Sequence, residues 1–415
     1  MSALKAQKVT SHKVVVIGAG PAGLMAAERI ASAGYQVDIY DAMPSVARKF
    51  LLAGKGGMNI THSEADRLFR QRFYEANDWV SEWLNVFNAT DLRDWLDLLG
   101  VETFIGTSGR VFPIEMKAAP LLRKWVHRLK QQGVEFHVRH KWLGWQQGCL
   151  HFKNIEKDVF VDSNAVLLAL GGASWPALGS DAQWVNFLVS KSEFRSFRPA
   201  NSGFECKWSQ YFADHNKGKP IKGVCISLAG DPVDKNKVKG EVMVDEKGLE
   251  GSLVYAHSAS IRNRIEERGY AEITIDLMPD LLKEEIVSRL NQPKGKMSLS
   301  SFMKKKLKLD SVKSMLLRER LSNSEMQDSK VMASYLKAFP LVLTKCFDIE
   351  HAISSAGGVK RSALTKELML INKAGVFCSG EMLDWEAPTG GYLLTASMAS
   401  GYYAANGLIH WLNER

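Results

Sequence analysis

The 415-residue sequence lacks any run of about 18 apolar residues that could span a bilayer. Its first residues, MSALKAQKVTSHK, lack the apolar stretch and cleavage site of a secretory signal peptide. We therefore expect a cytoplasmic protein that is not embedded in a membrane.

Cysteine is scarce and scattered. The sequence has five cysteines but no C-x-x-C pair, which argues against dithiol exchange. Its ten histidines show no H-E-x-x-H motif or comparable ligand spacing. We therefore expect no metal site.

A phosphate-binding loop of the Walker type is also missing, although the stretch AGKGGMNIT at 53–61 invites the comparison. Such a loop needs a glycine five positions before its Gly-Lys pair and a Ser or Thr after the lysine. Here Lys49 occupies the position of that first glycine, and Gly56 follows Lys55. This stretch must therefore serve another purpose.

Segment 13–44 reads as a strand, a turn, a helix and a second strand. The apolar run from Val14 to Ile17 is typical of a strand buried on both faces of a parallel sheet. A helix of small residues is expected over 24–33, and a second strand over 36–40. This order predicts a Rossmann unit.

The turn after the first strand carries G-x-G-x-x-G, formed by Gly18, Gly20 and Gly23. Gly18 permits a tight turn, Gly20 lets the backbone approach a pyrophosphate, and Gly23 lets the helix pack closely on the strand. The start of the helix offers free N–H groups to phosphates. Asp41, at the end of the second strand, can accept hydrogen bonds from a ribose diol. Together these features predict a dinucleotide site.

The rest of the chain alternates between helical and β character. Residues 64–130 are expected to be largely helical, with Trp79, Trp83 and Trp95 in the core. Short β-like runs follow over 200–275, and a basic helical pattern then runs to Ala338. We therefore expect a nucleotide-binding domain made of both ends of the chain, with a mixed insertion between them.

The C-terminal stretch GEMLDWEAPTGGY distinguishes between FAD and NAD. It places Glu381 near a glycine bend and a helix N-terminus at residues 389–391. A helix N-terminus aimed at a flavin ring stabilises the charge of the reduced form. Because NAD would need no such second loop, we expect FAD.

Five segments carry a resemblance to a known family: GAGPAGLMAA, RKFLLAGKGGMNITH, LALGGASWPALGSD, SSAGGV and GEMLDWEAPTGGYLLTASMASG. In this order, and over nearly the whole chain, the sequence resembles the bile-acid-reductase-like (BaiN/RdsA) flavoproteins. The resemblance implies an α/β fold with a glutathione-reductase-like FAD-binding Rossmann domain. This domain has three layers (ββα), and a β-barrel-like and helical domain is inserted into it. The expected boundaries are 1–198 with 350–415 for the FAD domain, 199–278 with 339–349 for the β-rich domain, and 279–338 for the basic helical subdomain.

The resemblance also implies which residues bind FAD. The pyrophosphate turn would include Pro21 and Ala22 besides its glycines, and Asp41 would bind the adenosine ribose. The remaining cofactor residues would be Lys49, Gly54, Lys55, Gly56, Asn59, Trp142, Gly171, Gly172, Gly380, Glu381, Thr389, Gly390, Gly391 and Tyr392.

The chain departs from the family pattern in the stretch AGKGGMN, residues 53–59. Much of the family reads S-G-G-G-R-C-N there, whereas this chain places Gly57 and Met58 at the positions of Arg and Cys. A thiol proton donor at this position is therefore excluded. We expect Lys55 to oppose negative charge on the reduced flavin, and it is the first catalytic candidate. Asp384, His62 and His257 are weaker acid–base candidates.

Three functions remain open. The first is an FAD-dependent oxidoreductase that reduces an activated C=C bond of a small molecule, with NAD(P)H as a transient reductant. The second is reduction of a base in ribosomal RNA, forming dihydrouridine. It is favoured by segment 294–320, which contains nine Lys and Arg residues and only two acidic residues. Against it, the segment has only one aromatic residue for base stacking, Phe302. The third is a flavin-binding redox sensor without turnover. The sequence predicts no particular oligomeric state.

Overall fold

The structure, a computed structural model, describes residues 12–188, 190, 193–229 and 238–415. The chain folds into two compact units. The first unit consists of residues 1–199 and 353–415, and the second of residues 200–352. The second unit is therefore an insertion within the first. The finer, three-part division of the chain remains a prediction.

The first unit contains a five-stranded sheet in the order β19-β10-β1-β2-β6, and every neighbouring pair is parallel. Its strands are β1 (Lys13–Ile17), β2 (Gln36–Asp41), β6 (Glu135–Val138), β10 (Ala165–Leu168) and β19 (Val376–Cys378). β1 and β10 are almost entirely buried, as their apolar sequences predict. The first two strands and the parallel α/β class expected from the sequence are confirmed.

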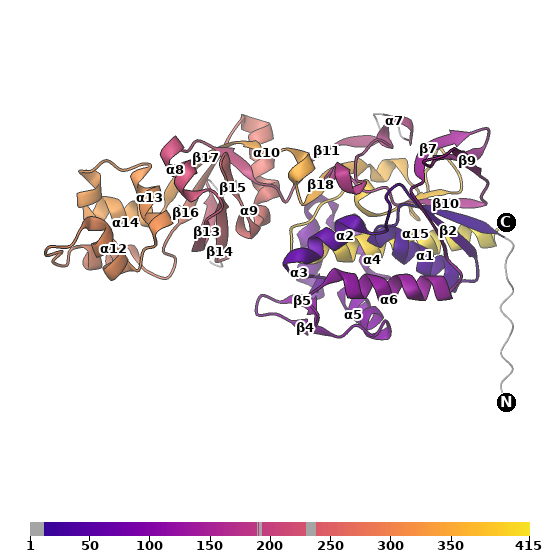
Figure 1. Ribbon diagram of the computed structural model, residues 1–415, viewed down its shortest axis with the longest axis horizontal. Helices are drawn as coiled ribbons and strands as arrows, with labels where there is room; N and C mark the ends of the chain where they lie inside the picture. The colour runs from indigo at the N-terminus through magenta and orange to yellow at the C-terminus, as the bar shows by residue number, and fades with distance from the viewer. Residues whose placement is uncertain (1–11, 189, 191–192, 230–237) are drawn as a thin grey trace. The chain divides into compact units, whose positions relative to one another are not determined.

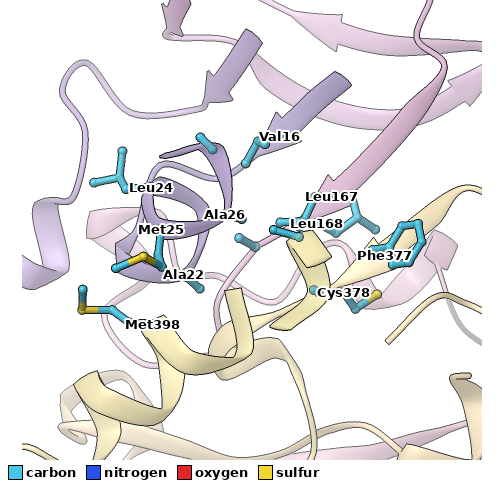
Figure 2. Packing of buried hydrophobic residues seen from close by; sticks show 14 of the residues in the cluster. Val16, Ala22, Leu24, Met25, Ala26, Leu167, Leu168, Phe377, Cys378 and Met398 are labelled. Atoms are coloured by element: carbon cyan, nitrogen blue, oxygen red, sulfur yellow. The ribbon is translucent and has the colours of Figure 1, made fainter. Parts of the chain in front are cut away.

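Two helices from opposite ends of the chain pack together against this sheet: α1 (Pro21–Ser32) and α15 (Tyr392–Asn413). Figure 2 shows Met25 of α1 near Met398 of α15, with Leu167 and Phe377 on the neighbouring strands. The helices can approach closely because residue 401 of α15 is glycine. A Cβ added there would lie 2.2 Å from the carbonyl oxygen of Ala22, so any larger residue at position 401 would force α1 and α15 apart.

An antiparallel meander covers the other face of the sheet (Figure 1). It consists of β7 (Lys141–Gln146), β8 (Cys149–Lys153) and β9 (Asp158–Val161). Tyr40 of β2 stacks on Phe152 of β8 with ring centres 4.3 Å apart, which joins the two layers. Helices, parallel sheet and meander form the three layers that the resemblance implied.

The region 61–131 is less helical than the sequence pattern suggested. It contains α3 (Asp66–Arg70), α4 (Asn77–Leu84), α5 (Ala89–Leu98) and α6 (Ala118–Gln131). It also contains a small antiparallel sheet of β3 (Thr61–His62), β5 (Arg110–Pro113) and β4 (Thr103–Ile105). The expectation of a largely helical segment missed this sheet because its strands have two to four residues, too few to show a period. Trp79, Trp83 and Trp95 are buried as expected.

Two further strands, β11 (Phe194–Ala200) and β18 (Ser354–Val359), pair with each other in a separate two-stranded sheet. Between α1 and α6, helix α2 (Arg48–Ala53) leads into a single 3-10 turn, Gly54–Gly56. In the described part of the chain, no helix is both long and apolar enough to cross a membrane.

The second unit contains a closed six-stranded barrel in the order β12-β15-β14-β13-β16-β17. Its strands are β12 (Phe204–Cys206), β13 (Pro220–Leu228), β14 (Gly240–Val244), β15 (Gly248–Glu250), β16 (Ala271–Asp276) and β17 (Phe339–Cys346). The barrel-like insertion expected from the resemblance is confirmed.

Seven helices accompany the barrel strands in the described part of this unit. They are α8 (Gln210–Asn216), α9 (Ser252–Ala256), α10 (Ser258–Arg268), α11 (Lys283–Leu290), α12 (Leu299–Leu307), α13 (Ser311–Arg318) and α14 (Ser329–Lys337). Phe302, Leu316 and Leu336 from the last three share one buried cluster with Ile273 and Phe339 of the barrel. The basic segment is therefore the outer face of helices whose apolar faces are packed.

Candidate functional site

A cavity of about 600 Å³ lies in the first unit at the carboxyl ends of the parallel strands. Gly18 follows β1, Asp41 ends β2 and Ala169 follows β10, and all three line the cavity. In open α/β sheets, ligands bind at this edge, where the chain crosses between strands.

The three glycines of the G-x-G-x-x-G turn have different surroundings. Gly18 has φ +102°, and a Cβ there would lie 2.2 Å from the carbonyl oxygen of Ala169. A Cβ on Gly23 would lie 1.9 Å from the carbonyl oxygen of Gly18, so helix α1 can approach the turn only with glycine here. A Cβ on Gly20 would meet no atom of the described residues within 4 Å. Gly20 therefore leaves open space at the start of α1.

Asp41 is held by two backbone N–H groups. Ala19 N donates to one carboxylate oxygen and Met43 N to the other, both at 2.8 Å. Burial raises the pKa of Asp41, while these two hydrogen bonds and the charge of Arg48 oppose the rise. The side chain is thus fixed at the rim of the cavity with oxygens that can accept further hydrogen bonds.

Lys49 and Glu381 form an ion pair in the cavity wall. The Lys49 Nζ lies 2.7 Å and 2.9 Å from the two carboxylate oxygens of Glu381 and donates to Ser174 Oγ at 2.6 Å. Ser355 N donates to the same carboxylate at 2.8 Å. Gly172 keeps this region compact, because a Cβ there would lie 2.5 Å from Ser355 Oγ.

The far end of the cavity is aromatic. Trp142 lines it and packs edge-on against Trp145 and Phe187, with ring centres 4.8 Å and 5.1 Å apart. Gly171 has φ +72°, and its carbonyl oxygen accepts from Trp184 Nε1 at 3.2 Å. These flat apolar surfaces suit a planar ring.

The chemistry of the wall fits a dinucleotide. Three of the residues that line it have a buried polar atom with no hydrogen-bond partner among the described residues: Arg48 Nε, Trp142 Nε1 and Ser180 Oγ. Buried polar groups are seldom left unpaired without a reason such as a ligand or bound water. Together with the open space at Gly20 and the half-buried carboxylate of Asp41, they match a ligand that carries phosphates, ribose and a ring.

Ten predicted site residues line this cavity: Gly18, Gly20, Pro21, Ala22, Asp41, Lys49, Trp142, Gly171, Gly380 and Glu381. Gly23 and Gly172 lie directly behind its wall. The other predicted residues belong to two segments outside the wall as the described residues define it, 54–59 and 389–392.

In the first of these segments, Gly54 packs against α6, since a Cβ there would lie 2.6 Å from the Cβ of Ala118. The Asn59 side-chain amide donates to the carbonyl oxygens of Thr61 and Val111, which ties the loop to the small sheet. Met58 is buried. Gly56 has open space around it, and the Lys55 side chain lies outside the described residues.

Gly57 fits its position only as glycine. Its φ is +111°, and a Cβ there would lie 3.0 Å from Met116 Cε. The arginine usual in the family at this point would have to displace Met116. The departure from the family pattern is therefore matched by the surrounding packing.

In the second segment, Thr389 and Gly390 form the turn before α15, and Gly391 caps the helix with φ +94°. A Cβ on Gly391 would lie 2.4 Å from the Cα of Thr61, so the start of α15 touches β3. Tyr392, the first helical residue, is buried, and burial raises its pKa.

The acid–base candidates have structural partners. The His62 Nδ1 accepts from Glu64 N at 3.1 Å and its Nε2 lies 3.0 Å from the carbonyl oxygen of Ser108. Asp384 lies 3.2 Å from Arg195 Nε, and burial raises its pKa although Arg195 opposes the rise. His257 belongs to the second unit.

Three side chains able to bind a metal lie together away from the cavity wall described above. One atom each of Asp38, Glu135 and His137 lies within 4.8 Å of the others. Lys13 Nζ already lies 2.7 Å from Asp38 Oδ2 and neutralises it. Sequence spacing could not show this group, because Asp38 and the other two residues come from different strands. The absence of a bound metal remains a prediction.

Sequence reasoning missed several residues of the cavity wall. Met43, Arg48, Pro176, Ser180 and Trp184 line it and were not predicted. Two of these, Pro176 and Ser180, lie within the LALGGASWPALGSD segment that carried the resemblance, but the segment alone does not show which of its residues line the cavity. Ser174 and Ser355 were missed because a serine that supports another side chain has no distinctive pattern.

The fold and the cavity together define a Rossmann-type dinucleotide-binding protein. The family model described as HI0933-like protein Rossmann domain matches residues 12–407. The chain therefore belongs to the HI0933-like family, and it is an FAD-dependent oxidoreductase. The resemblance read from the motifs is confirmed.

Named relatives are similar over nearly their whole length. A 3-dehydro-bile acid delta(4,6)-reductase of Clostridium scindens is 22% identical over 95% of this chain and 98% of its own. A ribosomal RNA dihydrouridine synthase of Haemophilus influenzae is 21% identical, over 94% and 97%. Among solved structures, a 3-ketosteroid delta1-dehydrogenase from Sterolibacterium denitrificans matches with a TM-score of 0.49 and 12% identity, over 98% of this chain and 100% of that one.

Proposed function

We propose that this protein uses FAD to reduce an activated C=C bond of a small molecule, with NAD(P)H as the transient electron donor. The observation that carries the proposal is the cavity at the strand ends, where the G-x-G-x-x-G turn, Asp41 and the Lys49–Glu381 pair converge. The name of the Clostridium scindens relative supports the reaction class.

The residues around the cavity would divide the binding of FAD among them. The N–H groups at the start of α1, beside Gly20, would hold the pyrophosphate. Asp41 would accept hydrogen bonds from the adenosine ribose, and the planar adenine would lie near Trp142. Lys49 and Glu381 would face the ribityl and phosphate region with opposite charges. When bound, FAD supplies two-electron transfer to the substrate.

Reduction of a C=C bond also consumes a proton, which can come from a side chain or from a bound water. Met58 cannot supply it, because a thioether has no ionisable hydrogen. The chain therefore needs another proton source, and a bound water or the substrate's own surroundings would serve. The Lys55 side chain remains a candidate.

The test is anaerobic mixing of the purified yellow protein with NADH and, separately, NADPH in a stopped-flow spectrometer. Bleaching of the flavin band near roughly 450 nm with either donor would support the proposed reductant. Adding candidate enones to the bleached protein should then restore the colour in proportion to the acceptor consumed. Bleaching by dithionite but by neither nicotinamide would contradict the proposed donor.

Reduction of a base in ribosomal RNA is the second candidate. Seven cations of segment 294–320 are exposed: Lys294, Lys296, Lys304, Lys305, Lys308, Arg318 and Arg320. They form a basic face on the second unit that could contact phosphates. However, Phe302 is 3% exposed and packs in the core, so it cannot stack on a base. This candidate rests on charge and on the named ribosomal RNA dihydrouridine synthases.

A further inference from the structure

Glu64, Arg72 and Tyr392 form a cluster at the first turn of α15. Arg72 Nε and Nη2 donate to the two carboxylate oxygens of Glu64 at 3.0 Å and 2.7 Å. The Arg72 guanidinium carbon lies 5.7 Å from the centre of the Tyr392 ring. Burial raises the pKa of the Tyr392 phenol, Glu64 raises it further and Arg72 lowers it, so both charged groups act on this side chain. The Glu64–Arg72 ion pair therefore lies against the buried side chain of Tyr392.

Further contacts tie the same two segments together. The His62 ring stacks on Tyr392 with ring centres 5.4 Å apart, and Phe69 packs against the ring at 4.9 Å. Next to them, Thr395 Oγ1 donates to Thr61 Oγ1 at 2.9 Å. Segment 61–72 thus contacts the first turn of α15 from several directions.

The glycine bend before α15 has no side chain with which to fix itself. Gly390 and Gly391 have φ values of +133° and +94°, which most other residues avoid. Such a bend keeps one conformation only if its neighbours hold it. Tyr392 follows the bend directly, so holding the Tyr392 ring also holds the bend.

We infer that Glu64 and Arg72 are positioning residues that act through Tyr392 to fix the Gly390–Gly391 bend. The inference rests on the proposed function, with Gly390 and Gly391 next to bound FAD as the family resemblance implies. No such role follows from sequence spacing, because Glu64 and Arg72 lie more than 300 residues before Tyr392.

The pairing is suited to positioning. An arginine bound through two nitrogens to one carboxylate has a fixed geometry as well as a charge. The Glu64 side chain is 10% exposed and the Arg72 side chain is 46% exposed, so solvent screens the pair from the Arg72 side only. Burial raises the pKa of the Tyr392 phenol, which is neutral at physiological pH even at its ordinary pKa.

The test compares Arg72→Met, Tyr392→Phe and the double variant in the full-length chain. The matched control is Arg361→Met, which breaks another arginine–glutamate pair of the same unit, with Arg361 Nη2 2.6 Å from Glu82. The readouts are the dissociation constant for FAD, the visible spectrum of bound flavin, and the free energy of unfolding without FAD.

We expect each single variant to weaken FAD binding by about tenfold, the loss expected for hydrogen bonds to charged groups. The spectrum of the bound flavin should shift as well. The double variant should bind FAD about as weakly as either single variant, because both changes remove the same interaction between Arg72 and Tyr392. The control should stay within about twofold of the wild type.

Independent losses that multiply in the double variant would overturn the inference, as would unchanged FAD affinity and spectrum in all variants. If Arg72→Met does not fold, Arg72→Lys replaces it. Lysine keeps the charge but loses the second bond, so an intermediate affinity is expected and wild-type affinity would contradict the inference. Failure of the wild-type chain to bind FAD would instead remove the proposed function.

Discussion

Lys49 Nζ lies within 2.7 Å of Glu381 Oε2, although the two residues are 332 positions apart. The pair joins α2, near the start of the chain, to the 3-10 turn Gly380–Met382 near its end. Both residues line the cavity. One wall of the cavity therefore forms only when the two ends of the chain have come together around the insertion.

Replacing Lys49 with Met should weaken both the fold and the binding of FAD. Among the described residues, the variant leaves the Glu381 carboxylate with Ser355 N as a hydrogen-bond donor, and the Glu381 side chain is only 16% exposed. Loss of hydrogen bonds to a charged group costs about 1–3 kcal/mol. Urea unfolding without FAD should show that loss. Glu381→Gln provides the comparison, because it keeps a hydrogen-bonding oxygen for Ser355 N, and an equal loss in both variants would contradict this reasoning.

Alanine at Gly23 should destabilise the fold, whereas alanine at Gly20 should leave stability almost unchanged. At Gly23 the new Cβ would lie 1.9 Å from a backbone oxygen, and such overpacking costs about 3 kcal/mol or more. At Gly20 it meets no atom of the described residues within 4 Å, so the free energy of unfolding should change by less than about 0.5 kcal/mol. Gly20→Ala should nevertheless weaken FAD binding by about tenfold or more, because the methyl group enters the space assigned to the pyrophosphate. Thermal unfolding and FAD titration measure both, and FAD affinity equal to wild type in Gly20→Ala would move the pyrophosphate elsewhere.

Acid should remove the contribution of the Glu64–Arg72 pair to stability. Burial raises the pKa of Glu64, but the hydrogen bonds from Arg72 and Tyr392 outweigh it and hold the pKa below the usual 4.5. A carboxyl whose pKa is lowered by folding stabilises the fold fully above its unfolded pKa and loses that contribution as pH falls through the folded pKa. Urea unfolding between about pH 6 and pH 3 should therefore show a steeper loss for wild type than for Glu64→Gln. Arg72→Met should flatten the curve similarly, since it removes the main cause, and parallel curves would refute the assignment.

The nucleotide-binding half of the site could be predicted because its chemistry is local in sequence. Gly18, Gly20 and Gly23 are within six residues, and Asp41 ends the next strand, so a single βαβ pattern determines their positions. The buried strands and the closing helix also follow from their apolar patterns. The structure places these residues around one cavity, as the pattern indicates.

The other half depends on contacts that no local pattern encodes. The contact of Arg72 with the Tyr392 ring and the hydrogen bond from Ser355 N to Glu381 both depend on how distant segments of the chain pack. The small sheet around Val111 was missed because its strands are too short to show a period. Phe302, the one aromatic residue of the basic segment, is buried in the core, and only the register of helix α12 against the barrel decides this.

Charge reversal on the basic face separates the two candidate substrates. Lys304→Glu, Lys305→Glu and Lys308→Glu together change three exposed cations of the second unit. If the protein binds RNA through this face, the triple variant should lose most RNA affinity, and the slope of log affinity against log salt should fall by about 2–3. Reduction of the bound flavin by NAD(P)H should not change, because the cavity belongs to the other unit.

The matched control reverses three other exposed lysines of the same unit, Lys207, Lys219 and Lys222, and so has the same net charge. Binding is measured by fluorescence anisotropy with single-stranded and hairpin RNA at about 50 mM and 200 mM salt, a range over which phosphate contacts weaken strongly. A loss confined to the first triple variant would favour an RNA substrate. Equal losses in both would indicate only general attraction to a basic protein, and weak, salt-insensitive binding by wild type would leave reduction of a small molecule as the supported function.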